Sequence, residues 1–142
     1  MKSKLLTKVA SIGTLLACVA PLILGCKQEA RERVKSLQEQ AIICLMEGNI
    51  DSYLDYFSMN ERQKNKMRTN IENEIGKHGK IIDYTIPKVK YVSENNNKCF
   101  VEYRLTYEDH FVEDFREEWV KEQNGKWTLM RYNRITKKYR KL

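Results

Sequence analysis

Cysteine and histidine are scarce in this chain. Four cysteines and two histidines are spread over 142 residues, and no Cys-x-x-Cys pair is present. A structural zinc site needs four Cys or His ligands at short spacings, so we expect no metal ion. No other feature of the sequence indicates a cofactor. Internal repeats are also absent, and the length suits one small domain.

The chain also lacks a basic segment within its central part, although its net charge is +7. Three lysines lie within the first eight residues. Five further cations lie in the last nine residues: Arg134, Lys137, Lys138, Arg140 and Lys141. The segment between these two groups is close to neutral. A nucleic-acid-binding domain carries its cations on one face or helix, so we expect no nucleic-acid partner.

The N-terminus has the layout of a secretory signal. Residues 1–8 contain lysines and no acid, and residues 9–25 contain no charge at all. This apolar run of about 17 residues is at the lower limit for a membrane-spanning helix. Pro21 and two glycines interrupt it. We therefore favour a cleaved signal peptide over a permanent transmembrane helix.

The end of the apolar run, Leu22–Cys26, resembles a bacterial lipobox. The resemblance implies that the Cys26 thiol is linked to diacylglycerol and that the signal peptide, residues 1–25, is removed. Residues 15–18 form a competing lipobox that ends at Cys18. Cleavage there would leave an apolar run at the mature N-terminus, so we favour Cys26. The alternative is that both cysteines are ordinary small apolar residues of the signal.

Three helices are expected after the anchor. Apolar residues recur at helical spacing over Gln28–Glu47, at Ala30, Val34, Leu37, Ala41, Cys44 and Leu45. A short helix follows over Asn49–Phe57, where Asn49 or Asp51 can cap it. The capping-box pattern Ser58–Glu61 then predicts a third helix that ends near Lys77.

The apolar period changes from 3.6 to 2 after Gly79, which indicates strands. In Lys98–Glu108 every second residue is apolar, and Asn124-Gly125 is a strong hairpin signal. Pro87 predicts an edge strand or a bulge. Four antiparallel strands are expected, over residues 82–91, 98–108, 111–123 and 126–135. The predicted fold class is α+β, with N-terminal helices packed on a curved four-stranded sheet.

Two segments carry a family likeness, Gly48–Tyr53 at the start of the second helix and Glu118–Trp127 around the last turn. With the lipobox and the element order, they resemble the small NTF2-like, cystatin-like lipoproteins of bacteria, a group of mostly unknown function. The likeness covers about residues 28–135. It implies a domain over residues 26–135, a basic tail over 136–142, and a cone-shaped sheet that can enclose a pocket. It implies no single activity.

Several residues are candidates for the wall of such a pocket: Tyr84, Tyr103, Tyr107, Glu113, Glu117, Trp119 and Trp127. The alternative is that they are ordinary core residues. Glu113 and Glu117 alternate with aromatic residues and are the best general-base candidates, unless a bulge leaves them at the solvated end of the sheet. Enzymes of this fold commonly use an Asp/His pair. Because His78 and His110 lie at a helix end and a turn, we do not favour an enzyme.

Two further features each allow two interpretations. Cys44 and Cys99 both fall on predicted core-facing positions, so they either form a disulfide or remain buried thiols. The basic tail either contacts anionic lipid headgroups or is a solvated terminus.

These observations together predict a lipid-anchored envelope protein. Its domain lies outside the cytoplasm, at the cell membrane or the outer membrane, and binds an envelope protein or a small ligand. One alternative is a small isomerase or dehydratase with Glu113 or Glu117 as base. A second alternative is an inhibitor-like interaction module.

Overall fold

The structure is a computed structural model that describes residues 19–93 and 97–139, with side chains described for 27–92 and 97–130. Most of the expected signal peptide, including Cys18, and the last three residues lie outside the described residues, and so does the side chain of Cys26. The described part consists of three helices followed by four strands. Among the described residues, none of the helices combines the length and apolar character needed to span a bilayer.

The three helices occupy the first half of the domain. Helix α2 spans Val19–Met46, α3 spans Ile50–Leu54 and α4 spans Glu61–His78. The side chain of Asn49 accepts a hydrogen bond from the Ser52 backbone N–H and caps α3, as one of the two predicted caps. Helix α2 begins before Gln28, so one continuous helix runs through the expected cleavage site.

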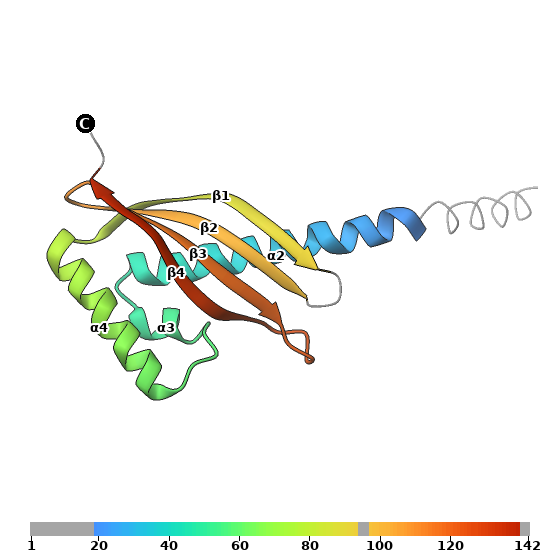
Figure 1. The fold of residues 1–142 in the computed structure, drawn as a ribbon, viewed down its shortest axis with the longest axis horizontal. Coiled ribbons are helices and arrows are strands. Elements are labelled where there is room, and N and C mark those ends of the chain that lie inside the picture. The colour runs from blue at the N-terminus through green and yellow to red at the C-terminus, as the bar shows by residue number, and fades with distance from the viewer. Residues whose placement is uncertain (1–18, 94–96, 140–142) are drawn as a thin grey trace, which may run out of the picture.

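The second half forms one antiparallel sheet in the order β1-β2-β3-β4. The strands are β1 (Ile81–Ser93), β2 (Lys98–Tyr107), β3 (Phe111–Lys121) and β4 (Trp127–Tyr139). The register shifts between Thr85 and Lys88, on either side of Pro87, as the sequence predicts. Two more shifts interrupt the pairing of β3 with β4. Such irregularities bend strands, and the sheet curves around the helices (Figure 1).

Strand β4 is longer than the sequence predicts. It continues to Tyr139, which pairs with Phe111, and its backbone pairs with β3 throughout positions 136–139. The first four residues of the expected basic tail are therefore part of the sheet. Charged residues occupy this segment, so the sequence does not show the alternation of apolar and polar residues that indicates a strand.

The core lies between the concave face of the sheet and α2, which crosses beneath it (Figure 1). On α2 the fully buried side chains are Val34, Gln38, Ala41, Ile42 and Leu45. The apolar stripe predicted from the sequence overlaps the buried face of α2, but it is rotated around the helix axis to one side of that face. Ala30, Leu37 and Cys44 are only partly buried, so they form a margin of the helix that stays accessible.

The junctions around α4 differ in one respect from the prediction. Its N-cap is Asn60, and Asn60 and Gln63 form the reciprocal capping box, two residues later than the expected box at Ser58. At the other end, Gly79 has φ +81°, and a Cβ there would lie 2.9 Å from the Cβ of Glu108. Glycine is therefore required where the chain turns from α4 into β1.

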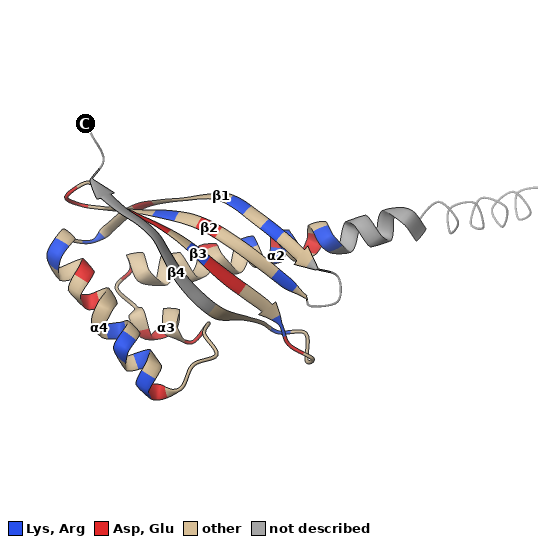
Figure 2. Ribbon diagram, viewed as in Figure 1, with Lys and Arg blue, Asp and Glu red and all other residues tan. Residues whose placement is uncertain are grey.

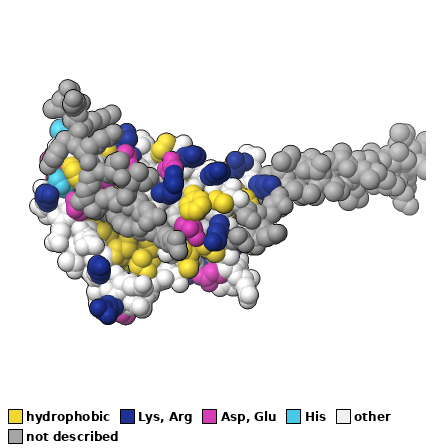
Figure 3. All heavy atoms as spheres, viewed as in Figure 1, with side chains coloured by type: hydrophobic (Ala, Val, Ile, Leu, Met, Phe, Trp, Pro, Cys, Tyr) yellow, Lys and Arg dark blue, Asp and Glu magenta, His cyan; other side chains and the backbone are white. Residues whose placement is uncertain are grey.

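The convex face of the sheet carries paired charges. Arg104 lies 2.6 Å from Asp114, Lys98 lies 3.5 Å from Glu118, and Arg116 pairs with Glu102. Acidic and basic positions are interspersed along β2 and β3 (Figure 2). In the same view Lys and Arg gather over β1 and β2 (Figure 3). This face is a solvated surface rather than a second core.

Candidate functional site

A groove lies between α2, α3 and the β3–β4 hairpin. It consists of two hollows of about 450 Å³ and 510 Å³ that share Arg33, Gly125 and Trp127. We call the 450 Å³ hollow the inner half and the 510 Å³ hollow the outer half. Each has the size of a small-molecule binding site.

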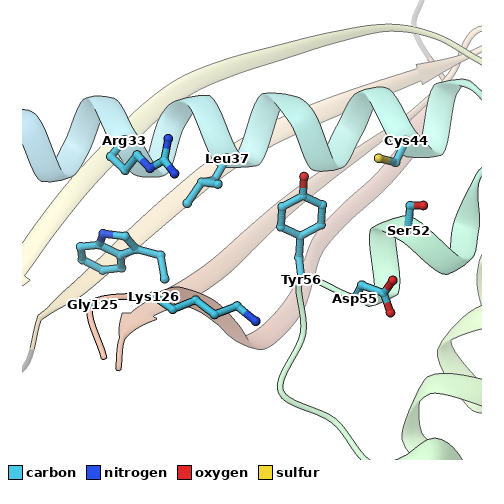
Figure 4. A pocket seen from close by; sticks show the side chains of 9 residues that line it. Arg33, Leu37, Cys44, Ser52, Asp55, Tyr56, Gly125 and Lys126 are labelled. Atoms are coloured by element: carbon cyan, nitrogen blue, oxygen red, sulfur yellow. The ribbon is translucent and has the colours of Figure 1, made fainter. Parts of the chain in front are cut away.

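The inner half is formed by side chains from three elements (Figure 4). Arg33, Leu37 and Cys44 come from α2 at positions i, i+4 and i+11, which share one helix face. This face is the accessible margin of the helix described above. Opposite it, Tyr56 rises from the end of α3, and Lys126 extends from the hairpin (Figure 4).

The wall opposite α2 is held in place by backbone hydrogen bonds between the segment after α3 and β4. The Leu129 N–H donates to the Tyr56 carbonyl at 2.8 Å, and the Ser58 N–H donates to the Leu129 carbonyl at 3.0 Å. The Tyr56 ring also contacts the Trp119 ring edge-on, with centroids 6.0 Å apart. These contacts fix the position of Tyr56 at the groove.

The conformation of the β3–β4 turn determines the side of the groove that the hairpin forms. Gly125 has φ +84°, and the Asn124 side chain accepts a hydrogen bond from the Lys126 N–H at 2.9 Å. The turn directs Lys126 and Trp127 toward the groove. The Asn-Gly signal in the sequence thus also defines one border of the groove.

Some charged side chains of the groove have a counter-ion among the described residues and others do not. Asp55 lies 3.7 Å from Lys64 and has a counter-ion. Arg33, Lys121 and Lys126 are all exposed, and no partner in the described part of the chain pairs with their charged groups. Arg33 lines both halves, Lys126 lines only the inner half, and Lys121, Glu29 and Glu32 line only the outer half.

A second cluster of polar groups lies inside the core, around Glu117. The Tyr53 and Tyr103 hydroxyls donate to Glu117 Oε1 at 2.9 Å and 2.7 Å. Burial raises the pKa of Glu117 to about 7, and the hydroxyls of Tyr103 and Tyr53 and the neighbouring Gln38 side chain work against that rise. Gln38 also accepts a 2.7 Å hydrogen bond from the Trp119 indole. This cluster joins α2, α3, β2 and β3.

Glu113 is the centre of a related arrangement nearer α4. The Tyr107 hydroxyl donates to its Oε2 at 2.8 Å. Glu113 and Glu74 line a cavity of about 20 Å³ between α4 and the sheet. That volume holds about one water molecule. His78, next to Glu74, is stacked on Phe111 and bound to Asp109 at 2.7 Å, so it is a core residue.

The structure separates the predicted pocket residues into three environments. Trp127 lines the groove, and Tyr103, Tyr107 and Glu113 line the 20 Å³ cavity. Glu117 and Trp119 are fully enclosed by the core, and Tyr84 packs at its margin. Glu113 and Glu117 face the core and not the solvated end of the sheet. Their carboxyls are bound by tyrosines and have no room for a substrate, so the general-base alternative gains no support.

The disulfide interpretation is wrong, because both thiols are free in the structure. Cys99 is buried near Arg31 of α2, and burial raises the pKa of its thiol to about 11. Cys44 lies about 20 Å further along α2 at 1.5 Å per residue. A disulfide needs Cα atoms within about 7 Å.

The groove residues that sequence reasoning missed are Arg33, Tyr56 and Lys126. Each is a common type of surface residue, and they come from three separate elements. The closest signal in the sequence was the apolar stripe of α2, because it includes Leu37 and Cys44, which border the groove. Tyr53 and Gln38 were missed as partners of Glu117 because their faces depend on how the helices pack.

The chain has the NTF2-like α+β fold. Its structure is similar to a candidate NTF2-like transpeptidase of Campylobacter jejuni, with a TM-score of 0.50 and 12% sequence identity. The match covers 68% of this chain and 96% of the other. At this identity the likeness shows the fold alone, and it confirms the predicted fold class. Comparison with models of known protein families and with curated protein sequences finds no match.

Proposed function

We propose that this protein is a lipid-anchored envelope lipoprotein whose NTF2-like domain binds a ligand or partner in the groove between α2, α3 and the β3–β4 hairpin. The groove itself is the observation that carries the proposal. It is large, it has a rigid aromatic wall, and it contains cations that no described side chain pairs with. Those are the features of a binding site and not of a packed interior.

The convex face and the core are weaker candidates for the same role. On the convex face Lys98, Arg104 and Arg116 each pair with an acidic side chain. In the core the carboxyls are bound by tyrosine hydroxyls, and the cavity holds about one water. An enzyme reaction or an inhibitor-like loop therefore has less support than binding in the groove.

The anchor is proposed from the lipobox at Leu22–Cys26. It would place the domain directly beside the membrane, because α2 is continuous from the anchor segment into the core. The site would then work outside the cytoplasm, at the cell membrane or the outer membrane, on molecules of the envelope.

Site-specific photo-crosslinking in cells tests the groove. A photoreactive amino acid is placed at Arg33 or at Lys126, which lie on opposite walls of the groove. Lys66, exposed on α4, is the matched control. We expect the same species to be captured from both groove positions and not from Lys66. Identical products at all three positions, or none at the groove, would contradict the proposal.

Replacement of Cys26 by serine tests the anchor separately. We expect Cys26→Ser to leave an uncleaved precursor that incorporates no labelled fatty acid. Cys18→Ser is the matched control and should be processed like the wild type. Labelling that survives in Cys26→Ser and disappears in Cys18→Ser would assign the anchor to Cys18. Labelling that is absent from the wild type would refute the anchor.

A further inference from the structure

We infer that the ligand of the groove is a single-chain anionic lipid, with its headgroup at the junction of the two halves and its hydrocarbon chain in the inner half. This inference rests on the proposed function, because it names the ligand class of the same groove. It follows from how charge and apolar surface are distributed along the groove.

The headgroup position follows from the cations. Arg33 of α2 lines both halves, Lys126 of the hairpin turn lines the inner half, and Lys121 at the end of β3 lines the outer half. The junction therefore carries Arg33 and has one lysine on each side of it, and none of the three has a partner among the described side chains. Arg33 at the junction can bind phosphate or carboxylate oxygens in a fork, and the lysines on either side add to the attraction for an anion.

The chain position follows from the inner half. Leu37, Cys44, Tyr56 and Trp127 give it a largely apolar lining, and its single acid, Asp55, is paired with Lys64. Polar backbone groups of a peptide would need hydrogen-bond partners, whereas a hydrocarbon chain needs none. From Arg33 to Cys44 the helix extends about 16 Å at 1.5 Å per residue, which gives an elongated site.

The place of the groove on the chain agrees with a lipid source. Arg33 lies about 10 Å along α2 from Cys26 at 1.5 Å per residue. With Cys26 anchored, the junction lies within about one Debye length of the headgroup layer. The outer half is then the side on which a lipid would enter.

Native mass spectrometry of the full chain, released from nonionic detergent, tests the inference. The probe is myristoyl lysophosphatidylglycerol. Myristoyl lysophosphatidylcholine has the same chain without net charge, and glycerol 3-phosphate has the anion without a chain. We expect the anionic lysolipid to bind at least tenfold more tightly than either comparator. Equal binding of the choline lipid, or equal binding of glycerol phosphate, would overturn the inference.

Two variants locate the headgroup and the chain. Arg33→Glu should weaken binding of the anionic lysolipid about tenfold, because it replaces an attraction by a repulsion. Lys35→Glu, an exposed change of equal charge on another face of α2, should leave it unchanged. Leu37→Asp should weaken binding of the anionic lysolipid, and far-ultraviolet circular dichroism should show that the helix is intact. Equal losses in the Arg33 and Lys35 variants would refute a bound headgroup.

The outcomes for the ligand class and for the groove are distinguishable. If the lysolipid fails to bind while crosslinking from Arg33 and Lys126 still captures one species, the ligand class is wrong and the groove remains a binding site. If crosslinking also fails, the proposed function is wrong as well.

Discussion

Replacement of Glu117 by glutamine isolates the contribution of one buried carboxyl to stability. The pKa of this group is raised from 4.5 to about 7 in the folded protein, chiefly by burial. In the unfolded chain it titrates near its ordinary value. Between these two values the unfolded chain has lost the proton while the folded protein keeps it, so the folded state binds more protons. The stabilising effect is complete below pH 4.5 and is lost as pH rises through about 7.

The magnitude follows from the size of the shift. A difference of about 2.5 pKa units corresponds to about 3 kcal/mol of unfolding free energy lost between these pH values. Glutamine keeps the shape and the acceptor oxygen for the Tyr53 and Tyr103 hydroxyls but cannot ionise. We therefore expect Glu117→Gln to match the wild type near pH 4.5 and to exceed its stability by about 3 kcal/mol at pH 8.

Urea unfolding of the full chain in nonionic detergent, followed by tryptophan fluorescence at several pH values, measures this difference. Glu118→Gln is the matched control, because the neighbouring carboxyl faces the convex side and pairs with Lys98. Its profile should run parallel to that of the wild type. If Glu117→Gln also runs parallel to the wild type, Glu117 does not titrate in this range and the reasoning fails.

The remaining predictions concern the ends of α4. Gly79→Ala should destabilise the fold by about 1–3 kcal/mol, because of its positive φ and the nearby Glu108 side chain, whereas Gly76→Ala within the helix should stabilise it by about 0.5–1 kcal/mol. Opposite signs in thermal melts are the expected result, and equal effects would contradict it. Asn60→Ala should cost about 1 kcal/mol through the lost cap, and Ser58→Ala much less. A larger loss in the Ser58 variant would favour the box that the sequence suggested.

The strands were the most predictable part of the fold. Alternation in β2 placed Val101, Tyr103 and Leu105 on the buried face, and the structure shows them there. Pro87 marked an irregularity in β1 because proline cannot donate a ladder hydrogen bond. These signals are local, so a single segment is enough to read them.

The candidate site was less predictable because it depends on how elements pack. The sequence placed Glu117 on an apolar strand face, but its partners Tyr53 and Gln38 come from two helices whose rotation is set by tertiary contacts. The prediction for α2 used apolar residues alone, so it omitted the buried Gln38. The predicted buried face of the helix was therefore rotated toward Cys44. The same shift produced the incorrect disulfide and concealed the margin that borders the groove.

The irregular edge strand β1 has a consequence for proteins crowded at one surface. An open strand edge offers unpaired backbone groups to a neighbouring copy, and such pairing leads to aggregation. In β1 the pairing register breaks at Pro87, and the exposed Lys88 and Lys90 follow it. Like charges meet when two copies approach by this edge, and the break prevents a continuous ladder. Many copies of the domain can therefore lie close together and remain separate molecules.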